Sequence, residues 1–243
     1  MLKNASMEEM AAYVCNELRK RDIEVVLSGG SCMEIYTDTL YSSYDIDLIM
    51  RYEQKKNAVR DIMLELGFSE DGKYFTFENN KNFIEFPSGP VAVGDEFIKV
   101  FNTKKTKFGE LKLLTATDCI KDRLCACYIH NDKKCFEHAL AVCHKNEINI
   151  ENLKLWAMDE DITIQNGLDE LLNQLDIINN PSDINLGKHL FFFCKEQILN
   201  ITKDVDQKEL QVELFNTYVG KCLFFGSSID NLIKLHKLYE DIK

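Results

Sequence analysis

Apolar and polar residues in the first hundred positions follow the periods of short strands and amphipathic helices. A Ser6 and Glu9 capping box opens an apolar pattern at helical spacing over 6–22, which predicts a first helix. Apolar runs bounded by Gly, Asn or Pro predict strands at 23–28, 44–50, 73–79, 82–87 and 95–102. The same pattern predicts a short helix that begins at Ser31 and a longer one over 53–67 that ends at Gly67.

From Thr115 onward the strand pattern stops and helical periodicity takes over. Helices are predicted at 115–130 and 132–145, and from Ile150 to the end with a break near 179–182. The sequence therefore predicts an α+β protein with a mixed sheet at the front and an all-helical C-terminal region. We expect a catalytic domain at 1–114, a helical hairpin at 115–158 that packs on it, and a helical C-terminal domain at 159–243.

The chain has 243 residues, of which 45% are hydrophobic, and a formal net charge of -11. No apolar run reaches the roughly 18 residues that a membrane-spanning helix needs, and the polar, acidic start is unlike a signal peptide. We therefore expect a cytoplasmic protein with no membrane contact. The acidic charge argues against non-specific nucleic-acid binding, so such a partner would have to meet a local basic patch.

Nine cysteines are present, but their spacing does not resemble a zinc site. No C-x-x-C pair occurs, and Cys135, His138, Cys143 and His144 share one predicted helix. Reduced thiols that pack as small hydrophobic residues are the favoured interpretation.

Two aspartates one residue apart lie inside the predicted strand 44–50. Side chains i and i+2 of a strand share a face about 6.5 to 7 Å apart, so Asp45 and Asp47 point together while Ile46 and Leu48 face the core. Carboxylates this close repel unless a cation lies between them. Oxygen ligands favour Mg²⁺ or Mn²⁺, so the pair predicts a site for one of these ions.

Glu85 is the candidate third ligand. It stands in the middle of the apolar strand 82–87, where a charge without a partner is costly. Three carboxylates around divalent ions provide a geometry suited to in-line displacement at phosphorus.

Gly29, Gly30 and Ser31 lie upstream, where a strand turns directly into a helix. Such a turn presents bare backbone N–H groups and the positive end of a helix dipole, which suits a polyphosphate, and Ser31 can add a hydroxyl donor. The lysine and spacing of a P-loop are absent, and so is G-x-G-x-x-G. Taken singly, the D-x-D and G-G-S motifs are common in exposed strands and turns.

The order of these motifs resembles the nucleotidyltransferase superfamily related to DNA polymerase β. The segment GGSCMEIYTDTLYSSYDIDLIM is similar to the opening of small prokaryotic nucleotidyltransferases, and FIEFPSGPV is similar to the strand of their third carboxylate. The segment LLTATDCIKDRLCACYIHNDKKCFEHALAVC resembles the helical hairpin that follows, so the resemblance covers 25–156. A more distant similarity is to toxin and abortive-infection nucleotidyltransferases.

The resemblance implies a nucleotidyltransferase fold and transfer of an NMP from an NTP to a hydroxyl acceptor, in a toxin–antitoxin or phage-defence setting if the distant similarity holds. It implies that Asp45, Asp47 and Glu85 bind Mg²⁺ or Mn²⁺ and carry catalysis. Gly29, Gly30 and Ser31 would bind the triphosphate, and Lys121 and Arg123 of the hairpin would contact the nucleotide. Where this family often has alanine the chain has Cys32 and Met33.

Several alternatives stay open on the sequence. The acceptor can be an RNA 3′ end, a protein or a small molecule, and an antitoxin partner and a homodimer are both compatible with the chain. Lysines 104, 105 and 107 form a basic patch in a predicted hairpin loop that suits phosphate binding or plain solvation. Phenylalanines at 191–193 and 224–225 suit core packing, an acceptor pocket or a dimer interface. A nucleotide-binding regulator without catalysis and an NTP phosphohydrolase are the rival functions.

Overall fold

The computed structural model describes residues 2–38, 41–52 and 56–179. Two compact units divide the chain at 1–171 and 172–243, and of the second unit only the end of the last described helix is included. The helices are η1 (Leu2–Asn4), α1 (Met7–Arg19), α2 (Gly29–Tyr36), α3 (Lys56–Glu65), α4 (Ala116–Tyr128), α5 (Lys134–Lys145), α6 (Ile150–Asp159) and α7 (Ile162–Asn179). The strands are β1 (Val25–Ser28), β2 (Asp45–Met50), β3 (Ser69–Asp71), β4 (Tyr74–Thr76), β5 (Phe83–Glu85), β6 (Ala92–Val93), β7 (Glu96–Phe97), β8 (Asn102–Thr106) and β9 (Gly109–Leu113).

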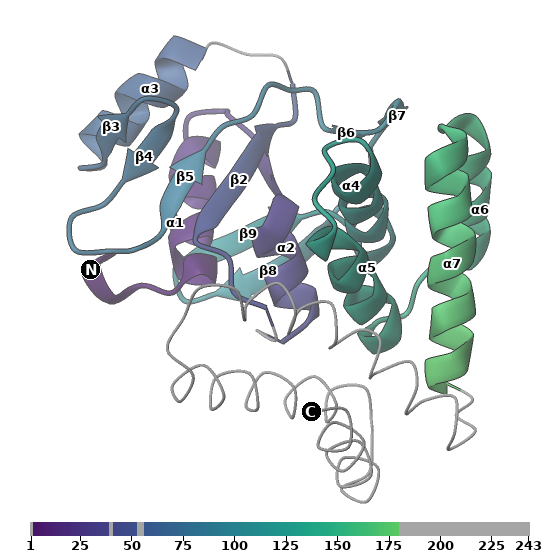
Figure 1. Cartoon of the computed structure of the whole chain (residues 1–243). Coiled ribbons are helices and arrows are strands. Elements are labelled where there is room, and N and C mark those ends of the chain that lie inside the picture. The colour runs from purple at the N-terminus through teal and green to yellow at the C-terminus, as the bar shows by residue number, and fades with distance from the viewer. Residues whose placement is uncertain (1, 39–40, 53–55, 180–243) are drawn as a thin grey trace, which may run out of the picture. The chain divides into compact units, whose positions relative to one another are not determined.

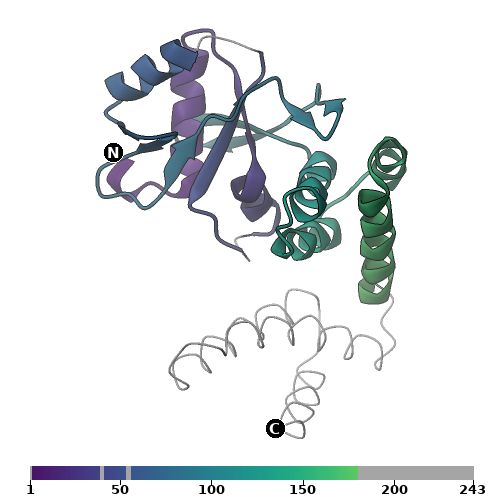
Figure 2. The same ribbon diagram turned by 45° about the horizontal axis from the view of Figure 1, so that its top comes forward.

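A seven-stranded mixed sheet is the frame of the first unit, with the order β3-β4-β5-β2-β1-β9-β8. The central strand β2 pairs antiparallel with β1 and parallel with β5. Figures 1 and 2 show α1 behind this sheet and α2 in front of it, with α4 and α5 beside α2. The α+β class, the mixed sheet and the helical region after it are therefore confirmed.

Alternating side chains of the central strands form the core. Leu27 of β1 is opposite Leu48 of β2, and Ile46 of β2 is opposite Ile84 of β5, and all four are fully buried. Helix α1 packs against β1 and β9 and starts with the expected capping box, in which Ser6 and Glu9 bond to each other's backbone N–H. Burial of these apolar side chains is the main term that holds the sheet together.

Two sequence expectations need correction. Helix α2 begins at Gly29 rather than Ser31, because Gly29 takes a φ of 67° and follows the extended N-cap Ser28. The strand expected at 95–102 is only Glu96–Phe97, which pairs with β6 in a separate hairpin around Gly94. Residues 98–101 belong to no strand, and strand structure resumes in β8 at Asn102.

The basic patch lies in a hairpin, as expected, but mostly in its strand. Lys104 and Lys105 belong to β8, and Lys107 lies in the turn before β9. Strand β8 is at the sheet edge and its residues are mostly exposed, so lysines can occupy it with their charges in water. Lys104 and Lys107 form ion pairs with Glu8 and Glu9 of α1. The aromatic segments at 191–193 and 224–225, and the helix break near 179–182 beyond Asn179, lie outside the described residues.

Candidate functional site

Strand β2 places both aspartates on the same side of the sheet. Its residues alternate between buried and half-buried, so Ile46 and Leu48 enter the core while Asp45 and Asp47 face the opposite side. This confirms the arrangement that the D-x-D spacing predicts.

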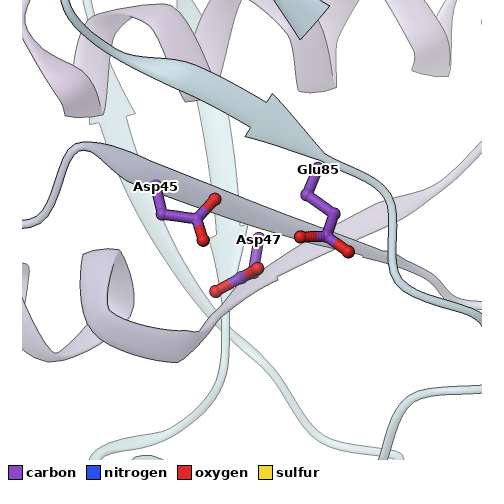
Figure 3. Close-up of side chains that lie close together, drawn as sticks. All are labelled: Asp45, Asp47 and Glu85. Carbon is purple, nitrogen blue, oxygen red and sulfur yellow. The ribbon is translucent and has the colours of Figure 1, made fainter. Parts of the chain in front are cut away.

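Strand β5 brings the third carboxylate to the pair. The parallel register puts Asp45 opposite Phe83 and Asp47 opposite Glu85, so Glu85 faces the same side as the two aspartates. One carboxylate oxygen from each of the three residues lies within 4.8 Å of the others. Figure 3 shows the three side chains directed toward one another, two from β2 and one from β5.

The N-terminus of α2 adjoins this group of acids. Ser28, the N-cap residue, pairs with Asp47 in the β1–β2 ladder, and its side chain makes no capping hydrogen bond. A β-carbon on Gly29 would collide with the Oδ2 atom of Asp47 and would also be strained at this positive φ. Glycine therefore lets the first turn of α2 lie directly against Asp47, and this turn has no side-chain cap from Ser28. A helix N-terminus without a side-chain cap suits a phosphate.

Two hydroxyls hold the backbone of Asp45 in place. Ser31 is fully buried, and its Oγ donates to the carbonyl oxygen of Asp45, as does the Oγ of Ser43. The Ser43 N–H in turn donates to Glu34 of α2 at 2.6 Å. Ser31 thus links α2 to β2 in this structure, and its contact with a phosphate stays a prediction.

Among the described residues, neither Asp45 nor Asp47 forms a side-chain ion pair. Burial, followed by the charges of Asp45 and Asp122, raises the pKa of Asp47 to about 7. Burial and the neighbouring Glu85 also raise the pKa of Asp45. The Oδ1 atom of Asp45 is buried without a hydrogen-bond partner among the described residues. A buried, unpartnered carboxylate oxygen among two other carboxylates fits an oxygen-ligated divalent cation.

The ammonium group of Lys73 forms an ion pair with Glu85, the third acid. Its Nζ is 2.7 Å from the Oε2 of Glu85, although the lysine side chain itself is 62% exposed. It reaches Glu85 from the β3–β4 turn, because Tyr74, the next residue, is opposite Glu85 in the β4–β5 ladder. Lys73 could not be predicted from the sequence, since only the strand register brings this turn to the acids.

Helix α4 carries the two other predicted nucleotide contacts in different surroundings. Arg123 is mostly buried and holds the carboxylate of Asp122 with two hydrogen bonds, of 2.6 and 3.1 Å. Both residues act electrostatically on Asp47, Arg123 lowering its pKa and Asp122 raising it. The structure therefore brings Arg123 near the acids, already paired with a carboxylate that the sequence analysis did not consider.

Lys121 is buried and paired. Only 1% of it is exposed, and its Nζ lies 2.6 Å from Glu96 of β7 and 3.1 Å from Asp118. The ammonium group also lies 6.0 Å from the ring centre of Trp156 in α6. In this arrangement Lys121 joins α4 to the β6–β7 hairpin, and its predicted role in nucleotide binding stays untested.

Among the residues that the structure describes, the only group of ligating side chains that could hold a metal is Asp45, Asp47 and Glu85. The seven described cysteines are buried and free of disulfides. Their burial agrees with the interpretation of these cysteines as packed, hydrophobic side chains. No helix within the described ranges is long and apolar enough to cross a membrane.

Comparisons with known proteins place the chain only distantly. No protein-family model matches it, and no curated protein is significantly similar to it. Among solved structures it is similar to the antibiotic-resistance factor ANT(2'')-Ia, known from a solution structure that reveals substrate-regulated conformation dynamics. The identity is 14% and the TM-score 0.38, over 70% of this chain and 94% of that one. At this level neither fold nor activity can be transferred, so the function must be inferred from the site itself.

Proposed function

We propose that this protein is a metal-dependent nucleotidyltransferase that transfers an NMP from an NTP to a hydroxyl acceptor. The observation that carries the proposal is the meeting of Asp45, Asp47 and Glu85 from two neighbouring strands beside the uncapped N-terminus of α2. The first feature fits divalent cations and the second fits a polyphosphate. The sequence resemblance to the superfamily supports the same assignment.

In the proposed reaction, the acceptor oxygen forms a bond to the α-phosphorus and the bond to the β-phosphate oxygen breaks, releasing pyrophosphate. Mg²⁺ or Mn²⁺, when bound, would neutralise the charge on the α-phosphate and lower the pKa of the acceptor hydroxyl. The N–H groups of Gly29, Gly30 and Ser31 would bind the phosphate tail. Glu85 lies on the far side of β2 from β1, so it is the carboxylate placed to accept the acceptor's proton.

Contacts within the fold hold the carboxylates and the start of α2 in place. The glycine at position 29 keeps α2 in contact with Asp47, and Ser31 and Ser43 fix the backbone of Asp45. The carboxylates are thus positioned before a ligand arrives, which reduces the reorganisation needed during transfer.

The test is incubation of the full-length protein with each α-³²P-labelled NTP, Mg²⁺ and total RNA, purified protein or a panel of small hydroxyl compounds. Label on an acceptor, with release of pyrophosphate, is the expected result. Release of phosphate from NTP without an acceptor would instead identify a phosphohydrolase. Nucleotide binding without any turnover across these acceptors would identify the regulatory alternative, and either result would overturn the proposal.

A further inference from the structure

Part-exposed aromatic rings adjoin the third carboxylate toward the β3 edge of the sheet. Phe83 is opposite Asp45 in the β2–β5 ladder, and Tyr74 is opposite Glu85 in the β4–β5 ladder. The two rings contact each other edge to face, with centres 4.8 Å apart. Because paired residues share a face, both rings belong to the face that carries the acids.

Lysines accompany these rings. Lys73 lies 4.9 Å from the centre of the Tyr74 ring while it pairs with Glu85. Lys81 lies 4.4 Å from the ring of Tyr44, a residue 48% exposed that directly precedes Asp45. The backbone also joins these pairs, because the N–H of Phe83 donates to the carbonyl of Tyr44 at 2.9 Å.

The two sides of β2 therefore offer different chemistry. Toward β1, bare N–H groups at the start of α2 suit a phosphate tail. Toward β5 and β4 lie two aromatic rings, the ammonium group of Lys73 and the third carboxylate. If the donor's phosphates occupy the first side, an acceptor must approach from the second.

We infer that Tyr74, Phe83 and Lys73 form the acceptor subsite and that it takes the 3′-terminal nucleotides of a single-stranded RNA. This inference rests on the proposed function and names its acceptor. Aromatic rings with adjacent lysines suit unstacked bases and their phosphates, whatever the base sequence.

Lys73 links the subsite to the acids. In the structure its ammonium group neutralises Glu85, and an acceptor phosphate would offer it an alternative partner. Transfer of Lys73 from Glu85 to the acceptor would leave Glu85 able to bind metal or accept a proton. Acceptor binding and completion of the site are thereby coupled through one side chain.

The experiment measures binding without turnover. Fluorescence anisotropy follows a labelled single-stranded oligoribonucleotide with a free 3′ hydroxyl, added to the full-length protein with Mg²⁺ and no NTP. Calorimetry follows an ATP analogue with a non-cleavable α–β bridge. We expect Tyr74→Leu and Phe83→Leu each to weaken RNA binding roughly tenfold, the loss of one stacked base, and to leave the affinity for the analogue unchanged. Lys73→Gln should lower the salt dependence of RNA binding by about one phosphate contact.

Tyr52→Leu is the matched control, because Tyr52 is also exposed and stacked by a cation, Arg51, but follows the opposite end of β2. It should change neither affinity, and Tyr74→Phe, which keeps the ring, should bind RNA like the wild type. Unchanged RNA binding in both leucine variants, or analogue binding by a wild type that does not bind RNA, overturns the acceptor inference alone. Failure of the wild type to bind either ligand overturns the proposed function with it.

Discussion

The protein handles two buried charged groups in opposite ways. Lys121 in α4 is 1% exposed, and its ammonium group contacts the carboxylates of Asp118 and Glu96. In β2 the Oδ1 of Asp45 is buried without a partner among the described residues, and Glu85 and Asp47 add like charge around it. The charge of Lys121 is compensated by two carboxylates of the chain, whereas the carboxylate of Asp45 needs a cation that is not part of the chain. This contrast separates a structural ion pair from a binding site better than burial does.

Substitution of Asp45, the carboxylate without a partner, should have the largest effect on activity. Asp45→Asn should lower nucleotidyl transfer by about a thousandfold or more, because it removes a metal ligand and charge that act in the transition state. Folding should be unimpaired, since the change removes electrostatic repulsion. Label transfer and Mn²⁺ binding by electron paramagnetic resonance measure the two effects. Asp169→Asn, at an exposed aspartate of α7, is the control. Near-normal transfer by Asp45→Asn would remove Asp45 from the catalytic set.

Lys121→Met should lower the stability of the protein and leave nucleotide binding unchanged. Loss of the ammonium group leaves Asp118 and Glu96 without their shared partner, and we expect the free energy of unfolding to fall by about 3 kcal/mol. Affinity for the ATP analogue should be unchanged in the folded variant. Urea denaturation and calorimetry measure the two quantities. An intact fold with a tenfold weaker affinity for the analogue would instead support the nucleotide-binding role that the sequence resemblance implies.

The stability of the metal-free protein should depend on pH through Asp47. Its pKa is about 7 in the folded protein, above the ordinary aspartate value. The folded state therefore holds the proton more tightly, and stability falls as pH rises from about 4 to 7. After allowance for solvent screening we expect a loss of about 1 to 2 kcal/mol from this residue. Thermal unfolding across this range measures the slope. Asp47→Asn should flatten it and Mg²⁺ should reverse the loss, whereas an unchanged slope in Asp47→Asn would refute the assignment.

Lys73→Gln should give the smallest effect. The lysine competes with a metal for Glu85, so its removal should tighten Mn²⁺ binding roughly two- to fivefold at low salt. The gain should shrink as salt is added, because an exposed ion pair is screened. Titration of Mn²⁺ at two ionic strengths measures it, with Lys105→Gln on β8 as the control. Weaker binding in Lys73→Gln would mean that the lysine supports the metal ligands.

Much of the acid site could be predicted because it depends on local spacing. The alternation of Asp45 and Asp47 with Ile46 and Leu48 follows from strand geometry, and an acid inside an apolar strand pointed to Glu85. Which residue Glu85 opposes could not be predicted, because the β2–β5 register depends on long-range pairing. The positions of Lys73 and the two rings depend on the same pairing.

The contacts made by helix α4 could not be predicted from the sequence. The family resemblance, and no local pattern, implied that Lys121 and Arg123 contact the nucleotide. In the fold the helix is enclosed on several sides by α2, α5, α6 and the β6–β7 hairpin. Ion pairs such as Lys121 with Glu96 arise only from that tertiary packing. The start of α2 was misplaced because the tight contact of Gly29 with Asp47 is likewise tertiary.

The parallel pairing of β2 with β5 has a consequence for the growing chain. Antiparallel neighbours can follow each other through a short turn, but here all of α3, β3 and β4 separates Asp47 from Glu85. During synthesis the two aspartates are therefore made before the third acid, and the three-carboxylate site cannot form until β5 has been made. Binding of a divalent ion by all three carboxylates would therefore require β5 to be paired with β2. Metal affinity would then measure whether this pairing of the sheet is complete.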